Sequence, residues 1–348
     1  MRKKIYNNIP ELCGDTPLVR LNKIVSKDGA NVFVKLEMFN PAGSIKDRIA
    51  FSMIEDAEKN GRLKSGGIIV ESSSGNTGVG LAMAGAVKGY TVIVICDRYL
   101  PMAKKIKLLS FGAHIIFLYK TPKGSDTVEL RLDLAKQIAS MLPNGITLNQ
   151  YDNLVNRETH YRTTGPEIVR DLDGKVNAVV CAVGTTGTLS GAGKAIKELV
   201  PTAKVIGVEP EGSIIFGGKP GKYLVQGGGL SFIPKNLDRS VIDIGVKVSD
   251  TNTFRTCREL ALREGLMVGG SAGGVVYAAL KIAKKMKKNE NVVCVLPDGG
   301  DRYLETIYSD TWLRENKLGK AILKKVDNKN LASVKNIAKR LGCTVDRF

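Results

Sequence analysis

Lys46 is the residue of this sequence whose surroundings most strongly indicate chemistry. It lies in the segment Asn-Pro-Ala-Gly-Ser-Ile-Lys-Asp-Arg at residues 40–48. On its own, a lysine after a Gly-Ser turn is typical of a solvated helix start. In a desolvated site, however, a lysine amine loses its proton more easily and can attack a carbonyl group. The choice between these interpretations depends on three turns elsewhere in the chain.

The first turn has the composition of an anion-binding site. It consists of Gly184, Thr185, Thr186, Gly187 and Thr188. Backbone N–H groups, hydroxyls and a helix N-terminus that converge in this way suit a phosphate monoester. The segment that follows lacks the third small residue of a dinucleotide fingerprint and the Lys-Ser/Thr pair of a triphosphate-binding loop. The turn therefore predicts the phosphate of a smaller cofactor.

The other two turns also carry polar groups. The second consists of Ser73, Ser74, Gly75, Asn76 and Thr77. Its hydroxyl, amide and backbone donors suit a substrate carboxylate or a ring oxygen. The third places Ser271 after two glycines at the start of a predicted helix. Each turn alone is better explained as a capped helix start, but together with Lys46 they favour a phosphorylated aldehyde cofactor.

The elements that must position these turns alternate regularly along the chain. The predicted strands are 31–37, 68–71, 90–96, 114–119, 146–150, 178–183, 204–209 and 291–297. Strands that alternate with helices predict parallel sheets covered on both faces. The length of 348 residues fits two doubly wound lobes. In such sheets ligands bind beyond the carboxyl ends of the strands, which is where we expect the turns.

The composition argues against several other classes of protein. The net charge is +18, but the basic clusters lack the interleaved aromatic residues typical of nucleic-acid binding. No apolar run is long enough for a membrane span or a signal segment, so we expect a cytoplasmic protein. The six cysteines and two histidines show no metal-ligand or disulfide pattern. Cys96, Cys181 and Cys294 lie in predicted strands, where we expect buried thiols.

Six motifs together resemble one enzyme family. They are Gly-Asp-Thr-Pro-Leu-Val from residue 14, the segment 40–48, Ser-Gly-Asn-Thr-Gly from 74, Thr-Thr-Gly-Pro-Glu-Ile from 163, the turn 184–188, and Pro-Asp-Gly-Gly-Asp-Arg-Tyr-Leu from 297. In this order they resemble the fold-type II pyridoxal-phosphate family of cysteine synthases and cystathionine β-synthases. The resemblance covers roughly residues 5–312. It implies an α/β fold in which two doubly wound parallel-sheet lobes hold pyridoxal 5′-phosphate in the cleft between them.

The resemblance also implies how the chain is divided. The larger cofactor-binding domain would comprise residues 1–46 and 158–315, and a smaller mobile substrate-binding domain would comprise residues 47–157. Residues 316–348 would form a basic C-terminal tail. Within it, Val334, Ile337, Ala338 and Leu341 have helical spacing and predict one docking helix.

The resemblance assigns a role to each residue of the turns. Lys46 would be the catalytic residue and form a Schiff base with the cofactor, Asn76 would bond the cofactor's 3′-oxygen, and Ser271 would bond its pyridine nitrogen. The cofactor phosphate would be held by Gly184, Thr185, Thr186, Gly187 and Thr188. The substrate carboxylate would be held by Ser73, Ser74, Gly75, Thr77 and Gln150. No metal is implied.

The implied reaction is β-replacement on an activated L-serine, either O-acetyl- or O-phospho-L-serine, through an aminoacrylate, with sulfide as the nucleophile. A second reaction would join O-phospho-L-serine to glutamate, as N-(2-amino-2-carboxyethyl)-L-glutamate synthase does in diaminopropionate and siderophore biosynthesis. Segments 212–220 and 308–313 resemble that enzyme. The resemblance is also compatible with a cysteine or serine β-lyase and with a non-catalytic regulatory homologue. The implied partners are small amino-acid substrates and a second copy of the chain, without nucleic acid or membrane.

Three positions depart from the family pattern. Ser73 replaces the usual threonine, Thr186 replaces a glycine, and residues 227–234 read Gly-Gly-Gly-Leu-Ser-Phe-Ile-Pro instead of Gly-Ile-Gly-Ala-Gly-Phe-Ile-Pro. We therefore expect a different pocket for the second substrate. Lys219 or Lys222 near its mouth could receive a phosphate, although an exposed, solvated lysine is the better interpretation of both.

Overall fold

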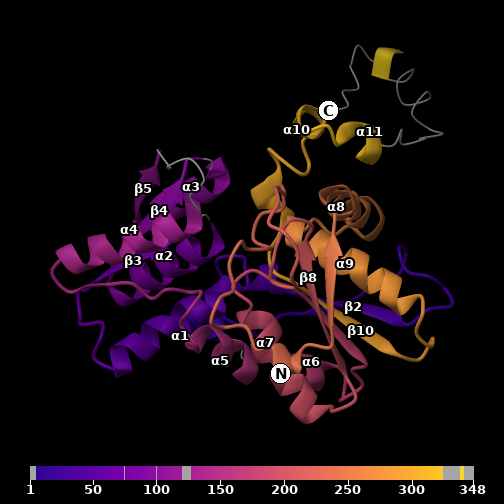
Figure 1. The fold of residues 1–348 in the computed structure, drawn as a ribbon, viewed down its shortest axis with the longest axis horizontal. Helices are drawn as coiled ribbons and strands as arrows, with labels where there is room; N and C mark the ends of the chain where they lie inside the picture. The colour runs from indigo at the N-terminus through magenta and orange to yellow at the C-terminus, as the bar shows by residue number, and fades with distance from the viewer. Residues whose placement is uncertain (1–4, 74, 99, 120–126, 324–337, 341–348) are drawn as a thin grey trace.

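Two sheets organise the chain (Figure 1). The structure is a computed structural model that describes residues 5–73, 75–98, 100–119, 127–323 and 338–340. The larger sheet has the strand order β1-β2-β10-β7-β8-β9, and the smaller sheet has the order β5-β4-β3-β6. The fold is therefore the two-lobed α/β arrangement that the sequence predicts.

The larger sheet is parallel except at one edge. Its strands are β1 (Leu18–Arg20), β2 (Asn31–Leu36), β7 (Ala178–Ala182), β8 (Lys204–Pro210), β9 (Ile244–Val248) and β10 (Asn291–Leu296). Strand β1 runs antiparallel to β2, so the prediction of an entirely parallel sheet is wrong at this edge. The sequence analysis missed β1 because it is three residues long, and missed β9 because it is a largely exposed edge strand with a glycine in its interior.

The strands of the smaller sheet all run parallel. They are β3 (Ile68–Ser72), β4 (Thr91–Asp97), β5 (His114–Leu118) and β6 (Gly145–Ile146). The last strand is shorter than the predicted 146–150. The backbone N–H groups of Leu148, Asn149 and Gln150 donate to the Glu71 carboxylate rather than to a neighbouring strand.

Helices cover both faces of each sheet. The longer ones are α1 (Lys46–Lys59), α2 (Asn76–Lys88), α3 (Met102–Ser110), α4 (Thr127–Met141), α5 (Val155–Arg162), α6 (Thr164–Asp171), α7 (Gly187–Leu199), α8 (Asp250–Glu264) and α9 (Gly270–Ala283). Two short helices, α10 (Asp310–Glu315) and α11 (Gly319–Ile322), follow, and the 3-10 turns are η1 (Ile9–Leu12), η2 (Glu37–Phe39), η3 (Arg239–Val241) and η4 (Gly300–Tyr303).

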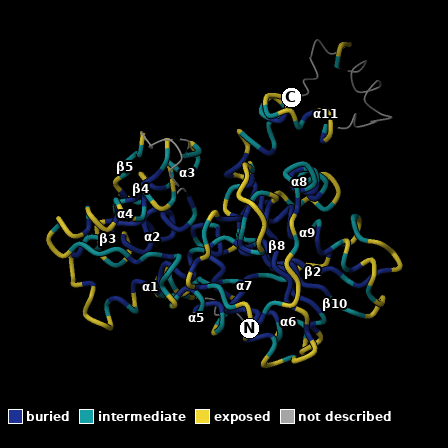
Figure 2. Tube along the Cα trace, viewed as in Figure 1, coloured by how far each residue is buried: buried dark blue, intermediate teal, exposed yellow. Residues whose placement is uncertain are grey.

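The two-residue period of the strands separates the packing faces. In β7, Val180 packs in the cluster that contains residues of α8 and α9, and its neighbours Val179 and Cys181 pack with residues of α6 and α7. The smaller sheet likewise packs α1, α2 and α3 on one face and α4 on the other. The central strands are buried, whereas the edge strands β1, β5 and β9 are partly exposed (Figure 2). Strands buried on both faces explain the continuous apolar runs in the sequence.

Several expectations concern cysteines, metals, membranes and the tail. Burial raises the pKa of Cys96 and of Cys181 to about 12, and both thiols lie inside strands as predicted.

Within the described residues, no cluster of three His, Cys, Asp or Glu side chains could hold a metal ion, and no helix is both long and apolar enough to cross a membrane. The predicted tail helix lies mostly outside the described residues. The described residues of this segment, 338–340, are helical.

Candidate active site

A cavity of about 950 Å³ is lined by residues that follow strands of both sheets. Ser73 follows β3, Arg98 follows β4 and Tyr119 follows β5 in the smaller sheet. Pro297 and Asp298 follow β10 in the larger sheet. Ligands of open parallel sheets bind at this end of the strands. The cavity is therefore the candidate active site.

The structure brings the sequence-predicted residues to this cavity. Those that line it are Lys46, Ser73, Gly75, Asn76, Thr77, Gln150, Gly184, Thr185, Thr186, Thr188 and Ser271. Gly187 adjoins them as the first residue of α7. Ser74 lies outside the described residues. Residues from five separate segments of the chain thus converge on one cavity, as the turns predict.

Lys46 is the first residue of α1 and its amine lies at the wall of the cavity. The Lys46 Nζ lies 3.5 Å from Thr185 Oγ1, which joins the lysine to the first turn. Burial lowers the pKa of Lys46 to about 8, and the negative charge of Asp298 partly opposes this shift. The neutral form of the amine, which attacks carbonyl groups, is therefore far more populated near physiological pH than in an ordinary lysine.

The turn before Lys46 is held rigidly from two sides. The Asp47 carboxylate accepts a hydrogen bond from the Ala42 backbone N–H at 2.7 Å. The Ile45 backbone N–H donates to the Pro297 carbonyl at 2.8 Å, which ties the turn to the end of β10. Gly43 has a φ of +89°, a conformation that favours glycine. These contacts fix the position from which the lysine side chain enters the cavity.

The first turn forms the N-terminus of α7. Thr186 caps this helix with a φ of 63°, in the left-handed region that a β-branched residue rarely adopts. This explains why a glycine is usual here in the family that the sequence resembles. A Cβ atom on Gly187 would lie 2.0 Å from Asn156 Oδ1, so only glycine fits at this position. The first N–H groups of the helix lack partners within it and can bind an anion.

Two buried side chains that the sequence analysis missed support this turn. His160 lies between Thr164 and Thr188, with Nε2 3.2 Å from the Thr188 Oγ1. Burial, with the charges of Lys46 and Arg48, holds the pKa of His160 well below its ordinary value, so the ring is neutral. Asn156 donates from Nδ2 to Thr185 Oγ1 at 3.0 Å. Both side chains therefore fix the hydroxyls of the turn.

The second turn meets Gln150. The Thr77 hydroxyl donates to Gln150 Oε1 at 2.6 Å. The Ser73 hydroxyl accepts from the backbone N–H groups of Gly75 at 3.2 Å and Gly78 at 2.9 Å. Behind them, the buried Glu71 carboxylate accepts the Gln150 backbone N–H at 3.1 Å. Hydroxyl and amide groups from two loops therefore converge, and Glu71 positions one of the loops.

Asn76 belongs to a polar cluster that the sequence did not predict. Its Nδ2 donates to Asp298 Oδ2 at 2.7 Å, and Arg302 donates to its Oδ1. The Tyr303 hydroxyl also donates to Asp298 Oδ2, at 2.7 Å. Arg302 donates as well to the Ala42 carbonyl in the turn before Lys46. The segment after β10 thus links the Asn76 amide to the lysine turn.

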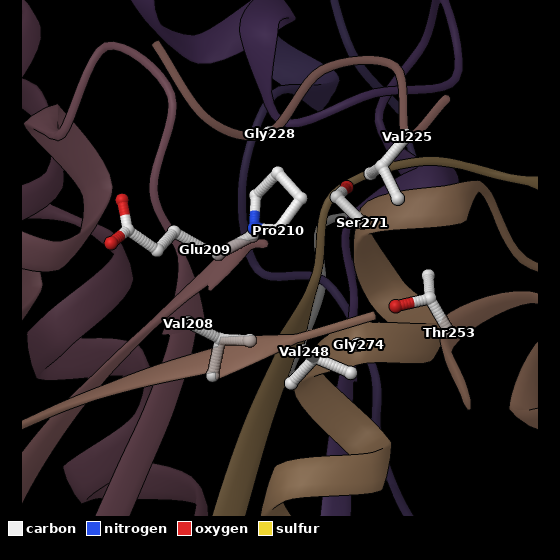
Figure 3. Close-up of a pocket in the computed structure, with 10 residues that line it drawn as sticks. Val208, Glu209, Pro210, Val225, Gly228, Val248, Thr253, Ser271 and Gly274 are labelled. Atoms are coloured by element: carbon white, nitrogen blue, oxygen red, sulfur yellow. The ribbon is translucent and has the colours of Figure 1, made fainter. Parts of the chain in front are cut away.

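Ser271 lies between the large cavity and a small one of about 10 Å³. The small cavity is lined largely by apolar groups, among them Val208, Val225 and Val248 (Figure 3). An apolar wall offers no hydrogen-bond partner, and no described residue pairs with the Ser271 hydroxyl. The hydroxyl is therefore available to a ligand in the large cavity.

The cavity wall is more basic than the sequence indicated. Lys104, Arg98 and Arg131 line it together with Lys46. Arg131 pairs with Asp97 at 2.8 Å. Lys219 and Lys222, the lysines considered from the sequence, are both exposed, and neither lines the cavity.

The described groups fit pyridoxal phosphate. A depressed-pKa lysine amine can hold the aldehyde, and the left-handed Thr186 with Gly187 leaves a helix N-terminus open for the phosphate. The Ser271 hydroxyl and the Asn76 amide supply neutral hydrogen-bonding groups for a ring between them. No further charged group is needed to bind the cofactor.

Comparison with known proteins agrees with this fit. The family model described as "Pyridoxal-phosphate dependent enzyme" matches residues 9–298. A probable cysteine synthase of Bacillus subtilis (strain 168) is 43% identical over 313 residues, a match that covers 89% of this chain and 98% of the relative. All of the predicted site residues lie within the span 9–298 of the family model.

Two solved structures share the fold. A hydrogen sulfide-producing enzyme from Fusobacterium nucleatum has a TM-score of 0.82 and 36% identity, with 86% of this chain and 100% of that chain covered. An O-acetylserine dependent cystathionine beta-synthase from Helicobacter pylori has a TM-score of 0.81 and 33% identity, with 88% and 100% covered. The similarity therefore extends over both sheets.

Proposed function

Since the chain belongs to the family of pyridoxal-phosphate dependent enzymes, we propose that it catalyses β-replacement on an activated L-serine with sulfide as the nucleophile. The observation that carries this proposal is the convergence of the Lys46 amine, the helix N-terminus at Gly187 and the Thr77–Gln150 pair on one cavity. The relative named as a cysteine synthase and the structure named as O-acetylserine dependent support the same class of reaction.

In this proposal the chain holds the cofactor at four places. Lys46 would bind the aldehyde carbon, the turn at 184–188 would bind the phosphate, Asn76 would bond the ring 3′-oxygen and Ser271 would bond the ring nitrogen. When bound, the pyridoxal ring withdraws electrons from the substrate α-carbon and so favours loss of its proton. A serine hydroxyl does not force the ring nitrogen to stay protonated, which favours loss of the β-substituent over transamination.

Lys46 is the residue that moves the proton. With cofactor and substrate bound, the free Lys46 amine would remove the α-proton of the substrate. Its pKa of about 8 suits a general base near physiological pH. After the nucleophile has added to the β-carbon, Lys46 returns the proton to the α-carbon. Acetate or phosphate leaves in the first half of the cycle, so ping-pong kinetics are expected.

The loops of the smaller sheet orient the substrate. The substrate carboxylate would accept hydrogen bonds from the second turn and from the loop that carries Gln150. The residues proposed to hold it are Ser73, Ser74, Gly75, Thr77 and Gln150. We infer that residues 47–157 move as one domain and close over the substrate, which excludes water from the cavity. Water exclusion would protect the substrate from hydrolysis to pyruvate after its β-substituent has left.

The proposed function is tested by an assay that measures both products of the reaction. The cofactor-loaded protein is mixed with O-acetyl-L-serine and sulfide, and we expect L-cysteine and acetate in equal amounts. Pyruvate release without sulfide would instead identify a β-lyase. A protein that carries the cofactor but releases neither acetate nor phosphate from the activated serines would overturn the proposal and favour a non-catalytic homologue.

Glu71 gives a prediction about substrate binding. In Glu71→Gln an amide NH₂ replaces one oxygen that faces the Gln150 loop, so the loop N–H groups lose an acceptor. We expect KM for the activated serine to rise roughly tenfold, with a smaller change in kcat. The control is Glu55→Gln on α1, whose carboxylate is exposed. Steady-state kinetics check this, and a fall in kcat alone would contradict it.

A second candidate is favoured by the charge of the cavity. Sulfide is small and needs no cluster of cations to bind, whereas Lys104, Arg98 and Arg131 line this cavity, with Arg131 paired to Asp97. The observation favours O-phospho-L-serine as the activated serine and glutamate as the nucleophile. Replacing sulfide with glutamate in the assay above separates the two candidates, because only the second yields N-(2-amino-2-carboxyethyl)-L-glutamate.

We further propose that the protein acts in the cytoplasm as a homodimer on small amino-acid substrates. The cysteines of the described chain form no disulfide, which supports a reducing compartment. Met102, Ile106 and Leu109 form an exposed apolar stripe along α3, which supports a contact between copies. Sedimentation at several concentrations tests the dimer, and a monomer throughout would contradict it.

A further inference from the structure

Lys104 on α3 is a buried cation in the cavity wall. The residue is only 3% exposed, yet it lines the large cavity. The Lys104 Nζ donates to Gln226 Oε1 at 3.3 Å and lies 4.7 Å from the centre of the Tyr303 ring. Within the described chain, no carboxylate lies within salt-bridge distance of this ammonium group. Its protein partners are thus a neutral amide and an aromatic ring.

A buried charge without an ionic partner is costly to a folded protein. Burial lowers the pKa of Lys104, and the charge of Arg302 acts in the same direction. Asp298 acts against this shift, but its Oδ2 already accepts hydrogen bonds from Asn76 and Tyr303. A cation in this position is explained if an anion joins it when the cavity is filled.

The position of Lys104 relates it to the substrate. A Cβ atom on Gly75 would lie 3.0 Å from Lys104 Nζ, so the ammonium group lies against the second turn. The negative charge of Asp298 raises the pKa of both Lys104 and Lys46, and the Tyr303 ring under the Lys104 ammonium group carries the hydroxyl that donates to Asp298. In the proposed function the second turn binds the α-carboxylate through neutral groups such as the Ser73 hydroxyl, which accepts two backbone N–H groups and keeps its own hydrogen to donate. The charge of Lys104 is therefore available to another anionic group.

We propose that Lys104 binds an anionic group that a substrate carries in addition to its α-carboxylate, and so determines the substrate class of this site. The inference rests on the proposed function. The anion would be either the phosphate of the activated serine or the side-chain carboxylate of an amino-acid nucleophile. On binding, the anion would replace or share the Gln226 amide as the partner of Lys104.

Three variants test this proposal in the cofactor-loaded protein. Lys104→Met removes the charge and keeps an unbranched side chain, and Lys104→Arg keeps the charge. The matched control is Lys107→Met on the same helix, because Lys107 lies 3.7 Å from Asp301, is 38% exposed and does not line the cavity. Thermal unfolding of each variant shows whether it is folded.

The first comparison measures release of one leaving group per active site from O-phospho-L-serine and from O-acetyl-L-serine. The second comparison uses calorimetry to measure the binding of L-glutamate and of L-glutamine, whose side chain has a similar shape but no charge. Neither compound undergoes β-elimination. For Lys104→Met we expect a loss of roughly 10- to 100-fold in one of the two comparisons. The loss would appear either in the half-saturating concentration of O-phospho-L-serine or in the Kd of L-glutamate. The neutral compounds, O-acetyl-L-serine and L-glutamine, should change by less than about twofold. Lys104→Arg and Lys107→Met are expected to stay near wild type.

A loss in the first comparison identifies the anion as the phosphate of the activated serine. A loss in the second identifies it as the side-chain carboxylate of the nucleophile. No change in either comparison would overturn the proposal. An equal loss for the charged and the neutral member would also overturn it, because Lys104 would then act on the shared α-carboxylate or on the fold. If the wild type released no leaving group at all, the proposed function would fail, while the glutamate and glutamine comparison would still decide the role of Lys104.

Discussion

Lys46→Ala is expected to reduce turnover by about 10³-fold or more while the protein still binds pyridoxal phosphate. In the proposed function the lysine supplies both the covalent link and the proton transfer, and a positioned general base alone contributes about 10² to 10⁴-fold. The variant does not change the turn at the N-terminus of α7, which we propose binds the phosphate. Leaving-group release and the cofactor retained after desalting are the two measurements.

The control for this variant is Lys59→Ala, because Lys59 ends the same helix and is exposed. It should match the wild type in both measurements. Wild-type turnover in Lys46→Ala would exclude this lysine as the catalytic base. Loss of the cofactor by both variants would instead show that the helix, rather than the amine, was disturbed.

Arg48→Met is expected to lower the free energy of unfolding by about 3–5 kcal/mol, because it removes one partner of a buried ionic network. Arg48 donates to Glu37 at 2.7 Å and to Glu167 at 2.6 Å, and all three residues are buried. Lys35 pairs with Glu167 at 2.9 Å. The variant leaves the Glu37 carboxylate without its cation. Urea unfolding at neutral pH measures the loss.

The pH dependence of stability is a second sign of this network. Burial alone raises the pKa of Glu167, but Arg48 and Lys35 lower it to about 2, below the ordinary value of 4.5. The folded state therefore gains stability from this carboxylate above pH 4.5 and loses it as the pH falls toward 2. In Arg48→Met the unfolding free energy should therefore fall less between pH 4.5 and pH 2 than it does in the wild type.

Arg62→Met provides the matched control for Arg48→Met. Its guanidinium pairs with Asp56 at 3.0 Å on the surface, where the Arg62 side chain is 47% exposed. An exposed pair of this kind contributes at most about 1 kcal/mol. Similar losses in the two variants would contradict the assignment of the Arg48 network as a buried structural unit that anchors the start of α1.

The starts of the helices show why the site was predictable from the sequence. Apolar periodicity predicts helices from residues 79, 192 and 275, but α2, α7 and α9 begin at Asn76, Gly187 and Gly270. Gly, Ser and Thr have low helix propensity, so the periodicity alone places the starts too late. In the structure these residues form the first turns, whose N–H groups face the cavity. The motif residues thus carried more information about the site than propensity did.

Lys104, Glu71 and His160 could not be predicted in the same way. A single lysine in an amphipathic helix is usually exposed. Lys104 is buried because α3 packs against η4, a contact between segments about 200 residues apart in the sequence. Glu71 is buried against the segment 148–150, and His160 is buried against α6 and α7. Such positions depend on tertiary packing and have no local pattern.

The departure at Thr186 was visible in the sequence, but its consequence was not. The sequence shows a threonine where a glycine is usual, and the structure shows that this threonine takes the left-handed conformation. The Thr186 hydroxyl donates to the Thr185 carbonyl at 2.7 Å, which offsets part of the conformational cost. The residue therefore adds a hydroxyl and a methyl group to the turn that we propose binds the phosphate.

The central claim is that Lys46 holds pyridoxal phosphate in this cavity. The most direct measurement is borohydride reduction of the cofactor-loaded protein, followed by proteolysis and peptide mass spectrometry. We expect one pyridoxyl group per chain on the peptide that contains Lys46. Lys104 lines the same cavity and is an internal comparison. A pyridoxyl group on the Lys104 peptide, or on no lysine of a protein that retains the cofactor, would contradict the account.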